Sequence, residues 1–182
     1  MDADATDEAL MLAYGRGDAT AFETLYARHR SGLFRYLLRH LRQPPLAEEL
    51  FQDVWSRLIG ARERYRPDAK FSTWLYQIAS NRLTDHWRAL SRQGGFVDEG
   101  DERIEREPDP TTPEREMSQF EQRRQLQRAL EELPAEQREV LLLRLDRELE
   151  LEEIARITGV GRETVKSRLR YAMDKLRSRL RS

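Results

Sequence analysis

The sequence predicts an all-α protein made of two small helical domains. Three observations lead to this prediction. Charged residues make up 36% of the 182 residues, and only nine glycines interrupt the chain. Apolar residues recur every three or four positions over most of its length, which is the period of amphipathic helices. One polar stretch, residues 94–112, lacks this period and divides the chain in two.

Composition also excludes several classes of protein. The 32 basic and 33 acidic residues nearly cancel, so affinity for nucleic acid would have to come from local patches. The chain has no cysteine, which removes disulfides and thiolate chemistry. No apolar run approaches the roughly 20 residues that span a bilayer, and the acidic N-terminus does not resemble a signal peptide. We therefore expect a cytoplasmic protein without membrane insertion.

The first domain, residues 1–93, is expected to contain four helices. Their apolar positions place them over residues 7–14, 18–41, 46–59 and 71–92. Asp18 is a suitable N-cap for the second helix. Pro44 and Pro45 should end that helix, and a polar, arginine-rich loop over residues 60–70 should precede the fourth.

The predicted helix over residues 71–92 has two distinct sides. One is an apolar stripe that would pack on its neighbours, formed by Leu75, Ala79, Leu83, Trp87 and Leu90. The other carries an aromatic ring beside polar and charged groups, namely Trp74, Asn81, Asp85, Arg88 and Arg92. This second side suits unpaired bases, which stack on a ring while arginine holds the backbone. A structural interpretation fits equally well: Trp74 would be core, and Asp85 would pair with Arg88.

Residues 94–112 are interpreted as a flexible acidic linker. Between Gly94 and Glu114, eight acidic residues oppose two arginines, and no apolar period remains. Such a segment is too polar to bury a core. The domains on either side are therefore expected to be tethered.

The second domain, residues 113–182, ends in a predicted helix-turn-helix. Two helices, over residues 113–132 and 133–145, precede it, and Leu145 is expected to pack beneath it. A helix from about Glu150 would end at Gly159, where the backbone turns. The last helix, from Arg162, carries an apolar stripe that ends at Leu180. Its other side is strongly basic, because residues 162–182 hold eight basic and two acidic side chains.

The basic helix has the composition of a DNA-recognition helix. In a helix-turn-helix, the first turns of the second helix touch base edges, and flanking arginines bind phosphates. Its candidate base-reading residues are Glu163, Thr164, Lys166, Ser167 and Arg170. The competing interpretation is a solvated basic helix in an ordinary bundle. The turn at Gly159 and the apolar stripe favour DNA binding.

The whole chain resembles a known family. Its N-terminal part contains AEELFQDVWSRL and FSTWLYQIASNRLTDHWR, and its C-terminal part contains LPAEQREVLLLRLDRELELEEIARITGVGRETVKSRLRYAMDKLRSRL. These motifs, in this order around an acidic linker, resemble a bacterial RNA polymerase sigma factor of the extracytoplasmic-function (ECF) group of the sigma-70 family. The resemblance covers nearly the whole chain.

The resemblance implies three sets of site residues. The N-terminal domain would recognise and melt the minus-10 promoter element, and the C-terminal domain would read the minus-35 element. The minus-10 set is Phe71, Trp74, Asn81, Asp85 and Arg88, to which the polar stripe adds Arg92. The minus-35 set is Arg162, Thr164, Lys166, Ser167, Arg170 and Tyr171. The set that would dock on the polymerase is Glu48, Glu49, Gln52, Asp53 and Trp55, with Glu49 standing where the family commonly has Asp.

The resemblance also implies the partners. These are core RNA polymerase, through its β′ clamp and β flap, promoter DNA in duplex and single-stranded form, and in many relatives an anti-sigma factor. We expect no cofactor, no metal and no catalytic residue, since His29, His40 and His86 share no ligand spacing. We also expect no extra regulatory domain after the last helix. The alternatives are a conventional helix-turn-helix regulator that binds operator DNA alone, an enzyme, and a helical adaptor.

Overall fold

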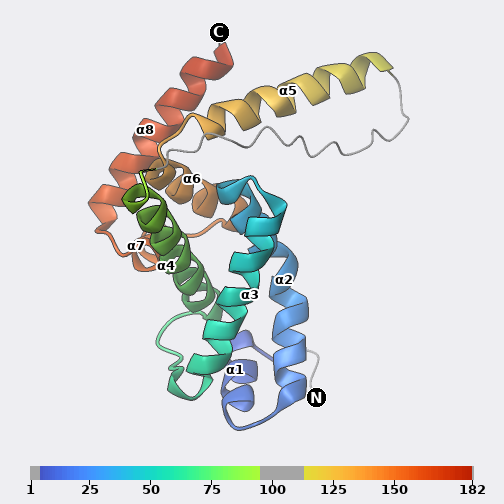
Figure 1. Ribbon diagram of the computed structural model, residues 1–182, viewed down its shortest axis with the longest axis vertical. Helices are drawn as coiled ribbons and strands as arrows, with labels where there is room; N and C mark the ends of the chain where they lie inside the picture. Colours follow the sequence, from blue (N-terminus) through green and yellow to red (C-terminus); the bar gives the residue numbers. More distant parts are fainter. Residues whose placement is uncertain (1–4, 95–112, 182) are drawn as a thin grey trace. The chain divides into compact units, whose positions relative to one another are not determined.

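The computed structural model describes residues 5–94 and 113–181, apart from the side chains of residues 113–119, 146 and 147. Over these ranges the protein is helical, with one short 3-10 turn and no strand, which confirms the all-α prediction (Figure 1). The chain divides into two compact units. The linker predicted over residues 94–112 lies outside the described residues, except for Gly94. The functional boundaries at 93 and 113 stay predictions.

Each unit is built from a short series of helices. The first contains α1 (Asp7–Gly15), α2 (Ala19–Leu41), α3 (Pro44–Ala61), the 3-10 turn η1 (Arg62–Arg64) and α4 (Phe71–Arg92). The second contains α5 (Pro113–Glu131), α6 (Ala135–Arg147), most of α7 (Leu151–Thr158) and α8 (Arg162–Arg181).

Local sequence signals explain most helix ends in the first unit. Asp18 Oδ1 accepts hydrogen bonds from the backbone N–H groups of Thr20 and Ala21 at 3.0 and 3.3 Å, so its predicted role as an N-cap is confirmed. The prediction for the two prolines was wrong. Helix α2 ends before Arg42, which has a left-handed φ of 62°, and Pro44 and Pro45 open α3 instead. Proline fits there because the first helical N–H groups need no partner within the helix.

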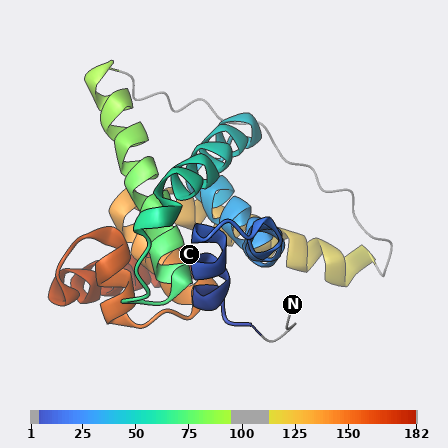
Figure 2. The ribbon, with the colours of Figure 1, turned by 90° about the horizontal axis from the view of Figure 1, so that it is seen from below.

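An aromatic core holds α2, α3 and α4 together. The predicted apolar positions Leu25, Leu33 and Leu37 of α2 are fully buried. Beside them, the Trp55 ring of α3 packs against Tyr26 and Phe22 of α2, at 5.0 and 5.8 Å between ring centroids. Toward the C-terminal end of α2, Tyr36 and His40 form a second group of rings with Tyr76 of α4. Figure 2 shows the same unit from below, with α3 crossing α4.

Helix α1 fastens the start of α4. Lys70 provides no side-chain cap for α4, but Glu8 of α1 accepts a hydrogen bond from the Phe71 N–H at 2.7 Å. Its neighbour Asp7 binds Arg28 at 2.8 Å and His29 at 2.6 Å on α2. Burial opposes ionisation of Asp7, but the hydrogen bonds from these two partners outweigh it and lower the pKa of the carboxyl group. Acidic side chains of α1 thus join three helices.

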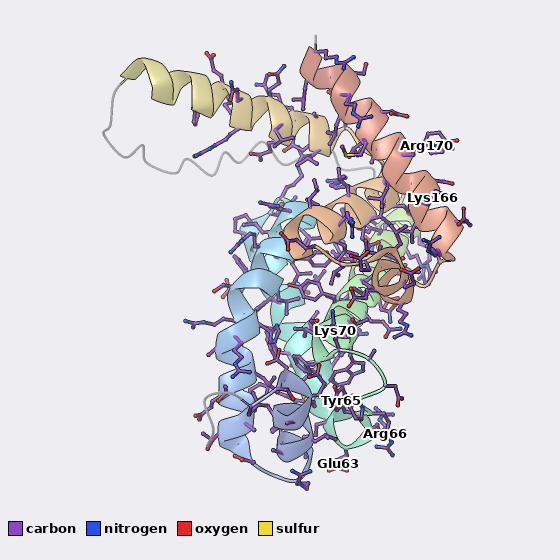
Figure 3. The ribbon with its side chains drawn as sticks, turned by 180° about the vertical axis from the view of Figure 1, so that it is seen from behind. Glu63, Tyr65, Arg66, Lys70, Lys166 and Arg170 are labelled. Carbon is purple, nitrogen blue, oxygen red and sulfur yellow. The ribbon has the colours of Figure 1, made fainter. Side chains whose placement is uncertain are left out.

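The segment between η1 and α4 is less polar than predicted. Tyr65 is 3% exposed, and its ring lies 4.9 Å from that of Trp74 and 6.3 Å from that of Phe71. The segment runs beside the start of α4, where Arg66 and Lys70 are seen with Tyr65 (Figure 3). Its charged residues and Pro67 face solvent, while the buried Tyr65 ring holds the segment against the core.

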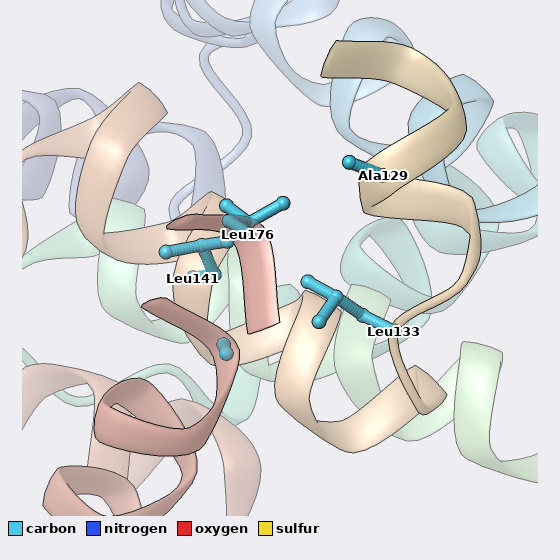
Figure 4. Close-up of a cluster of buried hydrophobic side chains, with 5 residues drawn as sticks. Ala129, Leu133, Leu141 and Leu176 are labelled. Atoms are coloured by element: carbon cyan, nitrogen blue, oxygen red, sulfur yellow. The ribbon is translucent and has the colours of Figure 1, made fainter. Parts of the chain in front are cut away.

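The second unit has a small aliphatic core between α5, α6 and α8. Its buried members are Ala129, Leu133, Leu141, Ala172 and Leu176 (Figure 4). The expectation that Leu145 packs beneath the helix-turn-helix was wrong, since this residue is 58% exposed, and Leu180, at the end of the apolar stripe of α8, is 44% exposed. Each lies in the final turns of its helix, beyond the part that neighbouring helices cover. Leu143, which was not singled out, is fully buried instead.

Candidate nucleic-acid interface

The helix-turn-helix forms as the sequence predicts. Gly159 takes a left-handed φ of 71° between α7 and α8, a conformation that favours glycine over other residues. Val165 is fully buried, which fixes the first turns of α8 against the unit. The predicted minus-35 residues Arg162, Thr164, Lys166, Arg170 and Tyr171 are exposed, and Ser167 is half-buried. Solvent therefore reaches nearly the whole set, and Lys166, Ser167 and Arg170 share one face of α8 at helical spacing.

Several basic side chains of α8 hold the helix in place within its own unit. Arg168 pairs with Glu136 of α6 at 3.3 Å, and its side chain is only 22% exposed. Arg179 pairs with Glu132 at 2.6 Å, and Lys175 Nζ donates a hydrogen bond to the backbone carbonyl of Glu132 at 2.6 Å. The +6 balance counted from sequence thus includes charges that tie α8 to α6 and to the end of α5.

The start of α8 is tied to α7 by an ion pair. Arg162 Nε donates to Glu152 Oε1 at 2.6 Å. The pKa of Glu152 is lowered, first by a hydrogen bond from its own backbone N–H and then by Arg162. Arg170 lies over the ring of Tyr171, at 5.1 Å from its centroid. Lys166 and Arg170, both on the first half of α8, remain directed outward (Figure 3).

A pocket of about 460 Å³ lies between the end of α3 and α4. It brings together two residues of the predicted minus-10 set, Trp74 and Asn81, and adds Arg57, Arg64 and Ile78. An aromatic ring, an amide and two guanidinium groups therefore share one open hollow. This composition suits a nucleotide, whose base can stack on the ring and whose phosphate can bind arginine.

The remaining minus-10 residues are distributed differently. Arg88 and Arg92 are exposed on α4. Asp85 pairs with Arg57 of α3, at 3.8 Å, and not with Arg88 as the structural interpretation proposed. Phe71, also in the predicted set, is fully buried beside Trp74 and Tyr65, so its side chain supports the pocket; its role at the minus-10 element stays a prediction.

The predicted docking residues of α3 also include both exposed and buried side chains. Glu48, Glu49 and Gln52 are exposed. Asp53 is half-buried and binds Arg57 at 3.2 Å, and it also accepts a hydrogen bond from Arg82 of α4. Trp55 is 5% exposed, and its ring packs against α2 in the aromatic core. Its place at or near the docking contact stays a prediction.

Sequence reasoning missed Arg57, Arg64 and Tyr65. Arg57 stands four residues after Asp53, a spacing that reads as an ordinary surface ion pair on one helix. Arg64 and Tyr65 lie in the segment that was interpreted as a polar loop. The density of arginines in residues 57–66 was the available signal, and it points to phosphate binding near Trp74.

The two surfaces define the class of protein. A helix-turn-helix with a basic second helix reads duplex DNA, and the separate pocket of ring, amide and guanidinium groups suits a single strand. Among the described residues, no helix combines the length and hydrophobicity that crossing a membrane requires. The chain is a helical DNA-binding protein.

Comparison with known proteins identifies its family. Residues 25–93 match the model of Sigma-70 region 2, and residues 129–178 match that of Sigma-70, region 4. The RNA polymerase sigma factor CarQ of Myxococcus xanthus is 31% identical over 90% of this chain and 91% of its own length. The chain belongs to the sigma-70 family of RNA polymerase sigma factors, in its extracytoplasmic-function group.

A second relative by sequence and two solved structures with the same fold are also similar to this chain. The RNA polymerase sigma-H factor of Pseudomonas aeruginosa is 29% identical over 93% of this chain and 92% of its own length. The sigma factor RpoE, solved with the anti-sigma factor NepR from Bartonella quintana, shares the fold with a TM-score of 0.70 at 22% identity, over 88% of this chain and 96% of that one. CnrH, solved with the cytosolic domain of CnrY, has a TM-score of 0.69 at 23% identity, over 94% and 95%.

Proposed function

We propose that this protein binds core RNA polymerase and directs initiation at promoters with a defined minus-35 and minus-10 element. The observation that carries the proposal is the presence in one chain of two unlike surfaces, a basic helix in a helix-turn-helix and a pocket of aromatic, amide and guanidinium groups. The recognition helix α8 suits the major groove of a duplex, and the pocket beside Trp74 suits an unpaired strand. A regulator of duplex DNA alone has no use for the second surface.

At the minus-35 element, the first half of α8 would lie in the major groove. Lys166 and Arg170 would bind base edges or nearby phosphates, while Thr164, Ser167 and Tyr171 offer hydroxyl groups to bases and backbone. Each good base contact contributes about 1 to 3 kcal/mol of discrimination. Arg162 would act from the edge of this surface, because Glu152 already holds it.

At the minus-10 element, capture of the non-template strand would drive melting. A base would stack on Trp74 and hydrogen-bond to the Asn81 amide, and Arg88 and Arg92 would bind the backbone further along α4. A protein that binds the separated strand better than the duplex shifts the equilibrium toward the melted state. No covalent step is needed, so the contribution of this chain is differential binding.

The polymerase would supply the remaining contacts. Glu48, Glu49 and Gln52, exposed on α3, would dock on the β′ clamp, with Asp53 at the edge of the contact. The unit that carries α8 would dock on the β flap. The solved relatives are complexes, one of them with a protein named as an anti-sigma factor, which supports control of this chain by such a partner.

Start-site mapping tests the proposal. Core polymerase would transcribe a fragmented genomic template with and without the protein, and new 5′ ends would be sequenced. We expect discrete new starts that share two upstream elements at fixed spacing. The variant Lys166→Ala with Arg170→Ala should lose these starts while still binding core polymerase. No new starts, together with tight binding of duplex DNA by the protein alone, would favour the conventional regulator.

A further inference from the structure

Arg57 occupies an unusual position between the proposed docking surface and the pocket. Its Nε atom donates to Asp53 Oδ2 on α3 at 3.2 Å, and its Nη1 atom lies 3.8 Å from Asp85 Oδ2 on α4. The same side chain lines the pocket with Trp74 and Asn81. One guanidinium group is thus shared by two carboxylates at the edge of a hollow that suits a nucleotide.

The interactions that hold Arg57 are weak. Its side chain is 48% exposed and that of Asp85 is 50% exposed, and ion pairs at such exposure contribute about 0 to 1 kcal/mol. The distance of 3.8 Å to Asp85 exceeds that of a hydrogen bond. Asp53 has a second partner in Arg82, so it stays neutralised if Arg57 turns away. Arg57 can therefore exchange partners at small cost.

A phosphate in the pocket would be a better partner than either carboxylate. A phosphate oxygen pair matches the forked donors of a guanidinium group, and Arg64 adds a second positive charge to the same lining. Asp85 alone would repel a phosphate at this point. If Arg57 turns toward the strand, it binds the phosphate and also screens that repulsion.

We propose that Arg57 binds a backbone phosphate of the captured single strand, and that Asp85 holds it in the free protein. The proposal rests on the function proposed above and extends it. It assigns strand binding to a residue of α3, and it gives Asp85 a competing role in place of a direct contact with DNA. Phosphate binding carries no base preference, so Arg57 contributes affinity and Trp74 with Asn81 contributes selectivity.

Strand binding by the holoenzyme tests this assignment. Core polymerase with each variant would be titrated with fluorescein-labelled dT12, dA12 and dC12 at several salt concentrations, and core polymerase alone would provide the background. Arg57→Ala should weaken all three about ten-fold. Removing one phosphate contact should also reduce the slope of log K against log salt by about 0.7. Asp85→Asn should strengthen binding more in the presence of Arg57 than in the Arg57→Ala background, where the substitution removes only the repulsion between Asp85 and the phosphate.

Matched variants separate this role from others. Arg30→Ala removes an exposed arginine of α2 and should change neither affinity nor slope. Arg57→Lys keeps the charge, so it should retain the salt slope with intermediate affinity. Equal strand binding by Arg57→Ala and Arg30→Ala would overturn the proposal, as would a decrease confined to one base, or to polymerase docking. If the wild-type holoenzyme gives no defined starts, the proposed function itself fails.

Discussion

The two surfaces that we propose to bind DNA differ in how their charges are used. On α8, Arg168 and Arg179 hold the helix against acidic residues of its own unit, while Lys166 and Arg170 stay outward. In the pocket of the first unit, the exposed Arg57 is balanced by carboxylates that a ligand could displace. A count of charges from sequence treats all of these arginines alike. The structure separates charges that build the surface from charges that are available to DNA.

The cores beneath these surfaces also differ. The first unit buries aromatic rings from α2, α3 and α4 in separate groups, including one around Trp55 and one that joins Tyr36 to Tyr76. In the part of it that the structure describes, the second unit buries aliphatic side chains only, among them the cluster of Ala129, Leu133, Leu141, Ala172 and Leu176 and the β-branched Val140, Ile154 and Val165. In a small core, each buried side chain supplies a larger share of the packing. The second unit should therefore respond more strongly to a single truncation.

The largest effect is expected from Leu141→Ala. This side chain is 1% exposed in the aliphatic core, and such truncations cost about 2 to 5 kcal/mol. The free energy of opening, measured by hydrogen exchange, should fall at the amides of α6 and α8. Leu145→Ala on the same helix is the control, because its side chain is 58% exposed and its truncation should cost less than about 0.5 kcal/mol. Equal effects of the two substitutions would mean that burial of Leu141 does not stabilise the second unit.

The next effect concerns the basic side chains of α8, some of which pair within the protein while others point outward. Lys166→Ala with Arg170→Ala should weaken binding of a duplex minus-35 element by the holoenzyme, because each base contact contributes about 1 to 3 kcal/mol. If either residue binds phosphate instead, the salt slope falls by about 0.9 for each such residue. Arg168→Ala removes one charge from the same helix, but its partner is Glu136. It should leave duplex affinity nearly unchanged, and a large decrease in affinity there would contradict the division.

A smaller effect is expected from the cap that α1 gives to α4. Glu8→Ala removes the acceptor of the Phe71 N–H bond, and loss of a helix cap costs about 1 kcal/mol. Chemical denaturation should show this decrease in the free energy of unfolding. Glu23→Ala, on the exposed side of α2, is the matched control. If Glu8→Ala is no more destabilising than Glu23→Ala, α1 does not stabilise the start of α4 through this bond.

Local signals allowed the helices to be predicted well. The expected helix over 71–92 matches α4 residue for residue, and Asp18 caps α2 as expected. Capping and helical period depend on residues a few positions apart, so the sequence contains them. Tertiary coverage depends on the neighbours of each helix. That is why Leu145 was assigned to a core that does not extend to it.

The candidate sites also depend on contacts between helices, which local sequence signals do not contain. Trp74 and Asn81 share a pocket as the period of α4 implied, but the pocket also needs Arg57 and Arg64 from the preceding elements. Phe71 and Trp55 lie in motifs that the resemblance associates with partners, yet they are buried. A match to a family motif covers residues of both kinds: those that contact the partner and those that position a neighbouring side chain. The match alone does not tell the two kinds apart.

The smallest effect should come from Tyr65→Phe. The Tyr65 hydroxyl group is buried without a hydrogen-bond partner among the described residues, so its removal should leave stability at pH 7 unchanged or raise it by about 1 kcal/mol. Burial, together with Glu8, Asp7 and Asp68, raises the pKa of Tyr65 to about 12. The unfolded chain releases this proton near its ordinary value of 10.0, so between the two values the folded state binds more protons. Stability must therefore fall as the pH rises through this range.

Urea denaturation at pH 7, 10 and 11 would measure this contribution. Tyr65→Phe should lose less stability on the alkaline side than the wild type does. Tyr171→Phe is the control, because that ring is 55% exposed on α8 and its substitution should leave the alkaline decline unchanged. A parallel decline in the wild type and Tyr65→Phe would mean that the phenol reaches water. The Tyr65 ring would then not hold the loop against Trp74 in a buried position.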